Sequence, residues 1–148
     1  MKLLTTLFLL FALLTFTACE GPGMGGNVKK EYFKGGKVRS EFTMTDKTGL
    51  NGKLKKFGYE GHLTSEVSIK NGVKNGTEIW YDSMGRIIRK VPYDNGKIHG
   101  TVREMYPNGT VMATIQYRHN IRQGKAFSYK KDGKVFKKVV FKDGRIIN

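Results

Sequence analysis

Hydrophobic and polar residues alternate along much of the chain beyond residue 30. In the stretch from residue 63 to 70, Leu63, Val67 and Ile69 occupy odd positions, while the even positions, Glu66 and Ser68 among them, are polar. Successive side chains of an extended strand point to opposite faces, so this pattern places the apolar set on one face and the polar set on the other. The alternation predicts half-buried antiparallel strands, and no helix is indicated after the N-terminal segment.

The same pattern recurs every 24 residues, which is the signature of a repeat architecture. Two glycine series keep this period: Gly61, Gly85, Gly109 and Gly133, and Gly52, Gly76, Gly100 and Gly124. A third series is Phe57, Tyr81, Met105 and Tyr129. Apolar residues stand two, six and eight positions after each later glycine of the first series: Ile87, Val91 and Tyr93; Val111, Ile115 and Tyr117; Val135, Val139 and Phe141.

Each long strand runs into a turn signal: Asn71-Gly72, Asn95-Gly96, His119-Asn120 or Asp143-Gly144. Asn-Gly and Asp-Gly pairs adopt positive φ at low cost, which tight reversals require. A shorter strand follows the second-series glycine and ends at the aromatic position. One repeat is therefore a hairpin made of a long strand, a turn and a short strand.

A single two-stranded hairpin is marginally stable in water, so these units must bury their apolar faces against neighbours. About five copies fit into residues 31–148, the first degenerate and the last truncated, and such atypical ends are expected of a repeat array. The predicted fold class is all-β, an elongated antiparallel meander of tandem β-hairpin repeats.

The segment Asn95 to Gly109, NGKIHGTVREMYPNG, resembles the MORN repeat family, and most closely the variant found in YwqK-type bacterial proteins. Gly76 to Gly100 resembles a whole unit, whereas Arg118 to Gly124 departs from the pattern by lacking an Asn-Gly pair. The resemblance implies an elongated antiparallel meander with a role in binding or scaffolding. YwqK-like proteins are often labelled antitoxins, so it also implies an alternative role, an immunity or antitoxin protein that binds a protein toxin.

Residues 1–18 are typical of a signal peptide, with Lys2 followed by an apolar run from Leu3 to Phe16. This run is shorter than the roughly 20 residues that a membrane-spanning helix needs. Phe16-Thr17-Ala18-Cys19 resembles a bacterial lipobox, although the family usually has Leu where Phe16 stands. The resemblance implies that Cys19 is acylated, with palmitate as a typical chain, and becomes the mature N-terminus.

Residues 19–30 contain four glycines and no hydrophobic periodicity, so we expect a flexible tether between the lipid and the repeats. The expected localisation is the bacterial cell envelope, with the exported chain anchored to a membrane, the outer membrane in a Gram-negative cell. The alternative is a periplasmic or secreted protein without a lipid.

Basic residues dominate the charge, with 27 Lys and Arg against 12 Asp and Glu and a formal net charge of +15, which favours anionic partners. A cluster lies near the C-terminal end: Lys130, Lys131, Lys134, Lys137, Lys138 and Lys142. Lysines on an edge strand deter pairing with other chains. The alternative is a contact surface for phospholipid headgroups, lipopolysaccharide or acidic cell-wall polymer. Such lysines also suit nucleic acid, but export argues against it.

No set of residues indicates catalysis, a metal or a cofactor. His62, His99 and His119 occupy three phases of the repeat without metal-ligand spacing, and no nucleophile elbow is present. The glycine spacing at residues 21–26 lacks the preceding strand and following helix of a dinucleotide site. The expected function is that of a non-catalytic lipoprotein whose repeats bind or scaffold.

Overall fold

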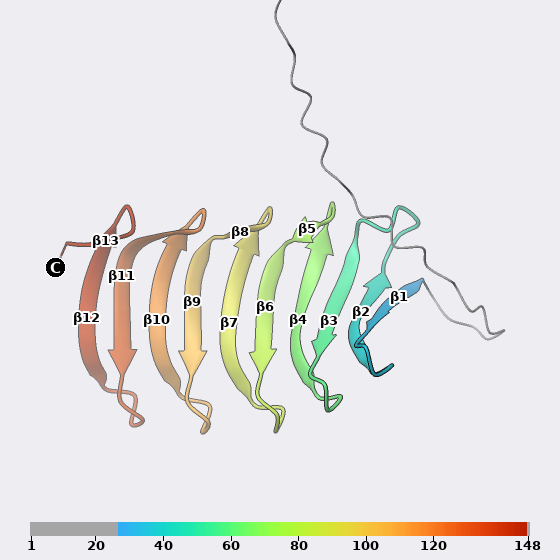
Figure 1. The fold of residues 1–148 in the computed structure, drawn as a ribbon. Coiled ribbons are helices and arrows are strands. Elements are labelled where there is room, and N and C mark those ends of the chain that lie inside the picture. The colour runs from blue at the N-terminus through green and yellow to red at the C-terminus, as the bar shows by residue number, and fades with distance from the viewer. Residues whose placement is uncertain (1–26, 148) are drawn as a thin grey trace, which may run out of the picture.

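A computed structural model describes residues 27–147, which form one antiparallel sheet of 13 strands and contain no helix (Figure 1). The order of the strands across the sheet follows their order in the sequence, so the predicted meander is confirmed. The signal segment, Cys19 and the tether up to residue 26 lie outside the described residues. Within the described part, no helix is long and apolar enough to cross a membrane.

The long arms of the hairpins are β4 (Leu63–Lys70), β7 (Ile87–Asp94), β10 (Val111–Arg118) and β12 (Val135–Lys142). The return strands are β6 (Gly76–Tyr81), β9 (Gly100–Met105) and β11 (Ile121–Tyr129). The degenerate first copy forms β1 (Val28–Tyr32), β2 (Val38–Met44) and β3 (Gly52–Phe57). Two-residue strands follow three of the turns: β5 (Val73–Lys74), β8 (Lys97–Ile98) and β13 (Arg145–Ile146).

Two features of the sheet differ from the pattern read in the sequence. Strand β1 begins at Val28, so the sheet includes residues 28–30, which the composition placed in the tether. In two copies the return strand is also divided into two segments. Directly after the turn, β5 pairs with β4 and β8 pairs with β7, and the longer strands β6 and β9 begin only afterwards. In the next copy β11 spans both segments without a break, and its pairing with β10 shifts between Ile115 and Tyr117.

The tight turns along one margin of the sheet connect the long arm of each hairpin to the strand that returns from it. Both central residues have positive φ, as in type I′ turns, and His119 (49°) and Asn120 (71°) do so without a glycine. The second residue of each turn donates its backbone N–H to a carbonyl oxygen of the preceding copy: Gly72 to Leu50 (2.8 Å), Gly96 to Lys74 (2.8 Å), Asn120 to Ile98 (2.9 Å) and Gly144 to Arg122 (3.0 Å). Each hairpin is therefore hydrogen-bonded to its neighbour at the turn as well as along the strands.

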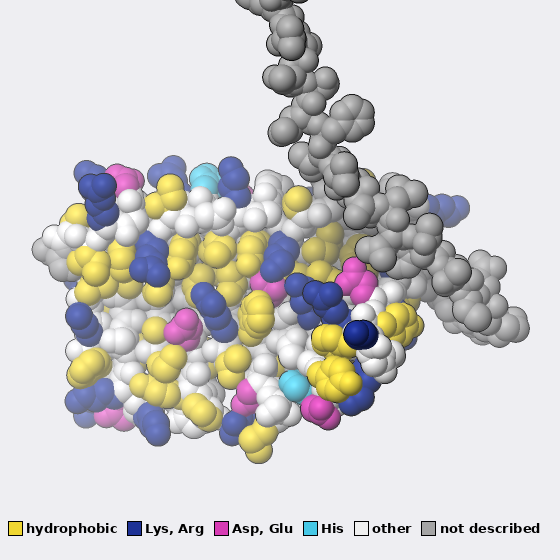
Figure 2. Space-filling view, viewed as in Figure 1, with side chains coloured by type: hydrophobic (Ala, Val, Ile, Leu, Met, Phe, Trp, Pro, Cys, Tyr) yellow, Lys and Arg dark blue, Asp and Glu magenta, His cyan; other side chains and the backbone are white. Residues whose placement is uncertain are grey.

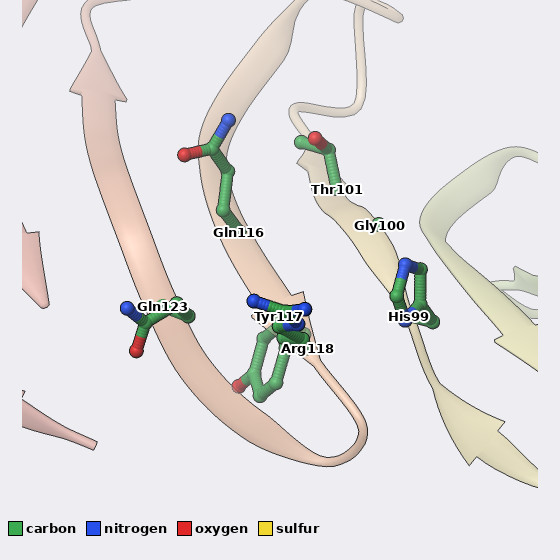
Figure 3. Close-up of a pocket in the computed structure, with 7 residues that line it drawn as sticks. All are labelled: His99, Gly100, Thr101, Gln116, Tyr117, Arg118 and Gln123. Atoms are coloured by element: carbon green, nitrogen blue, oxygen red, sulfur yellow. The ribbon is translucent and has the colours of Figure 1, made fainter. Parts of the chain in front are cut away.

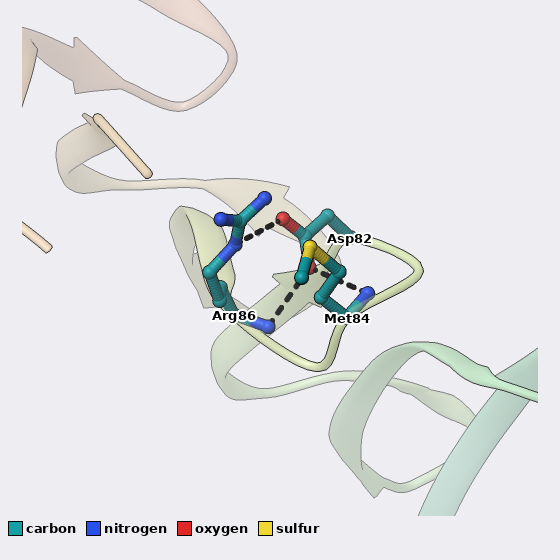
Figure 4. Close-up of polar contacts among 3 residues, drawn as sticks. All are labelled: Asp82, Met84 and Arg86. Atoms are coloured by element: carbon teal, nitrogen blue, oxygen red, sulfur yellow. Dashed lines mark hydrogen bonds and ion pairs between the residues drawn. The ribbon is translucent and has the colours of Figure 1, made fainter. Parts of the chain in front are cut away.

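Turns containing the first glycine series lie along the opposite margin of the sheet (Figure 1). In the turn around Gly85, the carboxylate of Asp82 accepts the backbone N–H groups of Met84 (2.9 Å) and Arg86 (2.9 Å) and the Nε of Arg86 (2.7 Å; Figure 4). The backbone and side-chain hydrogen bonds from Arg86 hold the pKa of Asp82 below its ordinary value. An ionised Asp82 therefore fixes the entry of the chain into β7.

The face of the sheet that carries the repeating apolar residues is called the packed face, and one row of side chains forms its centre. It is built from register pairs that recur every repeat: Leu54–Val67, Glu78–Val91, Val102–Ile115 and Ala126–Val139. Val67, Val91 and Val102 are 2–3% exposed, although the sheet has a single layer. Burying a Val side chain contributes about 1.5–3 kcal/mol. Flanking positions on the same face carry larger side chains, such as Trp80 and Tyr93, which explains how the central row is shielded from water.

Glu78 is the exception in this row, because a carboxylate stands where other copies have Leu54, Val102 or Ala126. It is 1% exposed, and both of its oxygens accept hydrogen bonds from the Nζ of Lys74 at 2.7 Å. The same Nζ lies 4.7 Å from the ring centroid of Tyr93. Burial, followed by the nearby charge of Glu78, raises the pKa of Tyr93.

We predict that Lys74→Ile lowers the free energy of unfolding by about 3 kcal/mol, because it leaves the buried Glu78 carboxylate without its cation. The double variant Lys74→Ile/Glu78→Val installs the residues that the next copy carries at these positions, Ile98 and Val102. Its stability should equal or exceed that of the unmodified protein, because a buried ion pair is often replaced by packed apolar residues without loss. Urea unfolding of the three proteins measures this, and a double variant no more stable than Lys74→Ile contradicts it.

Candidate binding surfaces

All six lysines predicted to contact anions are exposed and lie at the C-terminal end of the sheet. Lys130, Lys131 and Lys134 surround the turn between β11 and β12, where the N–H of Lys130 donates to the carbonyl of Lys134 (2.8 Å). Lys137, Lys138 and Lys142 belong to β12. Of the six, only Lys134 forms an ion pair within residues 27–147, at 3.9 Å from Asp132, and exposed pairs of this kind contribute little.

The lysines of β12 do not form one flat patch. Lys137 is opposite Ser128 and Lys138 is opposite Phe127, so their side chains lie on opposite faces of the sheet. An anionic surface laid against either face could therefore reach only one of this pair. The cluster is a property of the sheet edge, and its role as an anion site stays a prediction.

The face opposite the central apolar row carries an alternating series of charges at the N-terminal end of the sheet. Lys30 is opposite Glu41, Glu41 is opposite Lys55, and Lys55 is opposite Glu66. The carboxylate of Glu66 also pairs with Lys53 at 2.8 Å. Opposite charges on facing strands stabilise the pairing, so these residues favour the observed register.

A phenol completes the same cluster. The hydroxyl of Tyr81 donates to Glu66 (2.8 Å), and burial together with this carboxylate raises the pKa of Tyr81 to about 12. Hydrogen bonds from Lys53 and Tyr81 in turn hold the pKa of Glu66 below its ordinary value. Glu66 is therefore ionised and Tyr81 protonated at neutral pH, and both groups are committed to holding β4 against its neighbours.

A shallow depression of about 410 Å³ lies over β9, β10 and β11 (Figure 3). The lining residues are His99, Gly100 and Thr101 at the start of β9, Gln116, Tyr117 and Arg118 on β10, and Gln123 on β11. The side-chain Oε1 of Gln116 accepts a hydrogen bond from the backbone N–H of Lys125 (2.7 Å), and the side-chain Oε1 of Gln123 accepts one from the backbone N–H of Asp143 (2.9 Å). The side-chain NH₂ groups of both glutamines are left as donors. The lining has no carboxylate and offers these amide donors together with Arg118, so it suits a ligand that accepts hydrogen bonds.

His99 and His119 are neighbours, with ring centroids 4.9 Å apart, although they occupy different phases of the repeat. The contact joins a residue before a return strand to the turn residue 20 positions later. Equivalent positions are joined by hydrogen bonds in other copies: the side-chain oxygen of Asn51 accepts the backbone N–H of Asn71, and the side-chain oxygen of Gln123 accepts the backbone N–H of Asp143. This spacing within the repeat was the signal that could have paired the histidines. The described residues contain no group of three side chains that could hold a metal ion.

The face seen in Figure 2 carries a band of hydrophobic side chains across the strands, interrupted by Lys and Arg. Several large apolar residues are exposed on the described surface, among them Trp80 (36%) and Phe136 (70%). Mixed apolar, aromatic and basic surface of this kind is typical of protein interfaces, in which aromatic residues are enriched.

Residues 98–119 match a family model described as a MORN repeat variant. The matched segment contains β9, which is the return strand of one repeat, and β10, which is the long arm of the next, together with the His99–His119 contact. No curated protein is similar enough to the chain to match it. The family match suggests a binding or scaffold module, in agreement with the open sheet.

Proposed function

We propose that the chain is an exported lipoprotein of the bacterial cell envelope and that its repeat sheet is a non-catalytic binding module. The observation that carries the proposal is the one-layer sheet built from MORN-like hairpins, in which no second layer of the described residues covers either face. Ligand sites of enzymes are usually concave and largely enclosed. A sheet of this kind instead offers a partner equivalent side chains from several successive hairpins.

The repeat geometry supports simultaneous contacts with one partner. Trp80 lies on the packed face, in register with Arg89 and with Ser65, whereas Arg103 lies exposed on the opposite face, in register with Lys90. Neighbouring strands of a sheet are about 4.8 Å apart, so equivalent positions of successive repeats lie about 10 Å apart on one face, and an extended partner could contact several of them. Affinity can then be distributed over the array and does not need a deep pocket.

The proposed anchor is Cys19, because Phe16-Thr17-Ala18-Cys19 resembles a lipobox after an apolar signal segment. A chain from Cys19 to Val28, where β1 begins, reaches at most about 32 Å even when fully extended. Two or more acyl chains give stable attachment to a membrane. The binding sheet would therefore act within a short distance of the membrane that holds it.

We predict that the protein incorporates palmitate in a bacterial host and that Cys19→Ala abolishes the label and moves the protein to the soluble fraction. Phe16→Leu is the matched control: it introduces the residue usual in lipoboxes, so labelling should be retained or increased. Metabolic labelling followed by fractionation measures both effects. An unlabelled, soluble wild-type protein would refute the anchor and leave the periplasmic or secreted alternative.

The binding role predicts a discrete partner in the envelope. A photo-crosslinking residue placed in turn at Trp80, Arg103 and Phe136 samples the packed face, the opposite face and the C-terminal edge. We expect at least one position to give a discrete adduct in living cells after illumination, and the other positions serve as matched controls for random collision. Absence of any adduct at all three positions contradicts a binding module. An adduct with a co-produced toxin would assign the binding to immunity.

A further inference from the structure

Among residues 27–147, nothing pairs with most of the outer edge of β12. Strand β13 pairs only with Phe141 and Lys142, and the N–H of Ile147 donates to the carbonyl of Val140 (2.9 Å). Within residues 27–147, no strand pairs with residues 135–139 on that side. This edge exposes backbone donors and acceptors together with Phe136, which is 70% exposed.

The repeat shows how a strand would add to this edge. Strand β12 occupies the position of β4, β7 and β10, and each of these receives a return strand on the corresponding side. The residues equivalent to Lys138 are paired there: Glu66 with Ile79, Lys90 with Arg103 and Thr114 with Phe127. Because the carbonyl of Val140 points outward to Ile147, the alternation of a strand directs the N–H and C=O of Lys138 outward as well. The edge is therefore arranged for one more antiparallel strand.

Charge indicates what kind of strand would fit. Two basic residues of the sheet form ion pairs with acids directly opposite them on the neighbouring strand: Lys30 with Glu41 (3.4 Å) and Arg89 with Glu104 (3.8 Å). Lys137 is the repeat equivalent of Arg89, and the position facing it on an added strand is that of Glu104. Neither Lys137 nor Lys138 has an ion-pair partner in the described part of the chain.

We propose that the β12 edge binds an extended acidic segment of a partner protein as an additional antiparallel strand. Adjacent carboxylates of the segment face Lys137 and Lys138, one on each face of the sheet, while apolar side chains pack near Phe136. The proposal rests on the binding role above and specifies its partner. Lysines on an edge strand repel generic partners. A second copy is disfavoured because its β1 edge also carries Lys29 and Lys30.

The test uses the full-length protein in detergent and a fluorescent synthetic peptide in which a central Glu-Glu pair is flanked by valine and threonine. One control peptide has Lys-Lys at the centre, and another keeps the two glutamates but is N-methylated on the amides that would face β12. Fluorescence anisotropy should show binding of the acidic peptide, at least about tenfold weaker binding of the N-methylated peptide, and none of the basic one. Equal binding of the two acidic peptides refutes strand addition.

A matched pair of variants separates hydrogen bonding from charge. Lys138→Thr and Lys138→Pro both remove one charge, but only proline also removes the outward N–H, which makes no bond to β11. We expect Lys138→Pro to bind the acidic peptide about tenfold more weakly than Lys138→Thr, whereas Lys130→Thr, at the turn, changes binding little. Equal affinities of the two Lys138 variants overturn the proposal. Circular dichroism checks their fold, and the peptide controls decide the question if the proline variant does not fold.

Other occupants of the edge would give different results. Binding to phosphatidylglycerol vesicles without binding to the acidic peptide would identify the lysines as a membrane contact and refute the proposal. Self-association in sedimentation that Lys138→Pro abolishes would identify a second copy and refute it too. In-cell adducts at Trp80 or Arg103 combined with no peptide binding would refute the edge site and leave the binding role intact.

Discussion

A hairpin in a one-layer sheet can bury its apolar side chains only against the hairpins on either side, and the rest of the structure depends on this constraint. It explains why Val67, Val91 and Val102 occupy a single row across the strands with almost no exposure. It also explains the strict period, because a shift of one residue would move a strand's whole apolar set to the other face. The hydrogen bonds between each tight turn and the preceding copy fix that register at the margin of the sheet.

The architecture could be predicted because it is encoded by local signals that repeat. Alternating polarity defined the strands, and the Asn-Gly and Asp-Gly pairs defined the turns, where both residues have positive φ. The split return strands could not be predicted, because β5 and β8 are too short to show a period. The start of β1 at Val28 was also missed, because its Lys-rich, fully exposed sequence carries no apolar alternation.

The candidate sites were harder to predict, since they depend on which repeats lie next to one another. Nothing in the neighbouring residues distinguishes Glu78 from an exposed strand glutamate, although the 24-residue period aligns it with Leu54 and Val102. The register with Val91 shows that it stands in the buried row. The lysines near the C-terminus were found by composition, but their division between two faces follows from pairing with Phe127 and Ser128. The sheet therefore places these lysines along an edge, which is one of the two interpretations that the sequence offered, and their role as an anion site stays a prediction.

The two ends of the described sheet differ in a way that bears on function. At the β1 end, Lys30 already has its acid in Glu41, and that charge ladder continues through Lys55 to Glu66. At the β12 end, Lys137 and Lys138 stand opposite Ser128 and Phe127 on one side and an open edge on the other. Most residues of the repeats are needed for turns and packing, so the edge is where side chains remain available for a partner.

Residue-resolved hydrogen exchange of the full-length protein tests the central claim, that a regular hairpin array ends in an open, pairing-competent strand. We predict slow exchange at the N–H of Val139, which the alternation of the strand directs toward β11, and fast exchange at the outward N–H of Lys138. Central strands such as β7 and β9 should be protected throughout. Equal, strong protection of Lys138 and Val139 in the protein alone would contradict the account, because the edge would then be covered already.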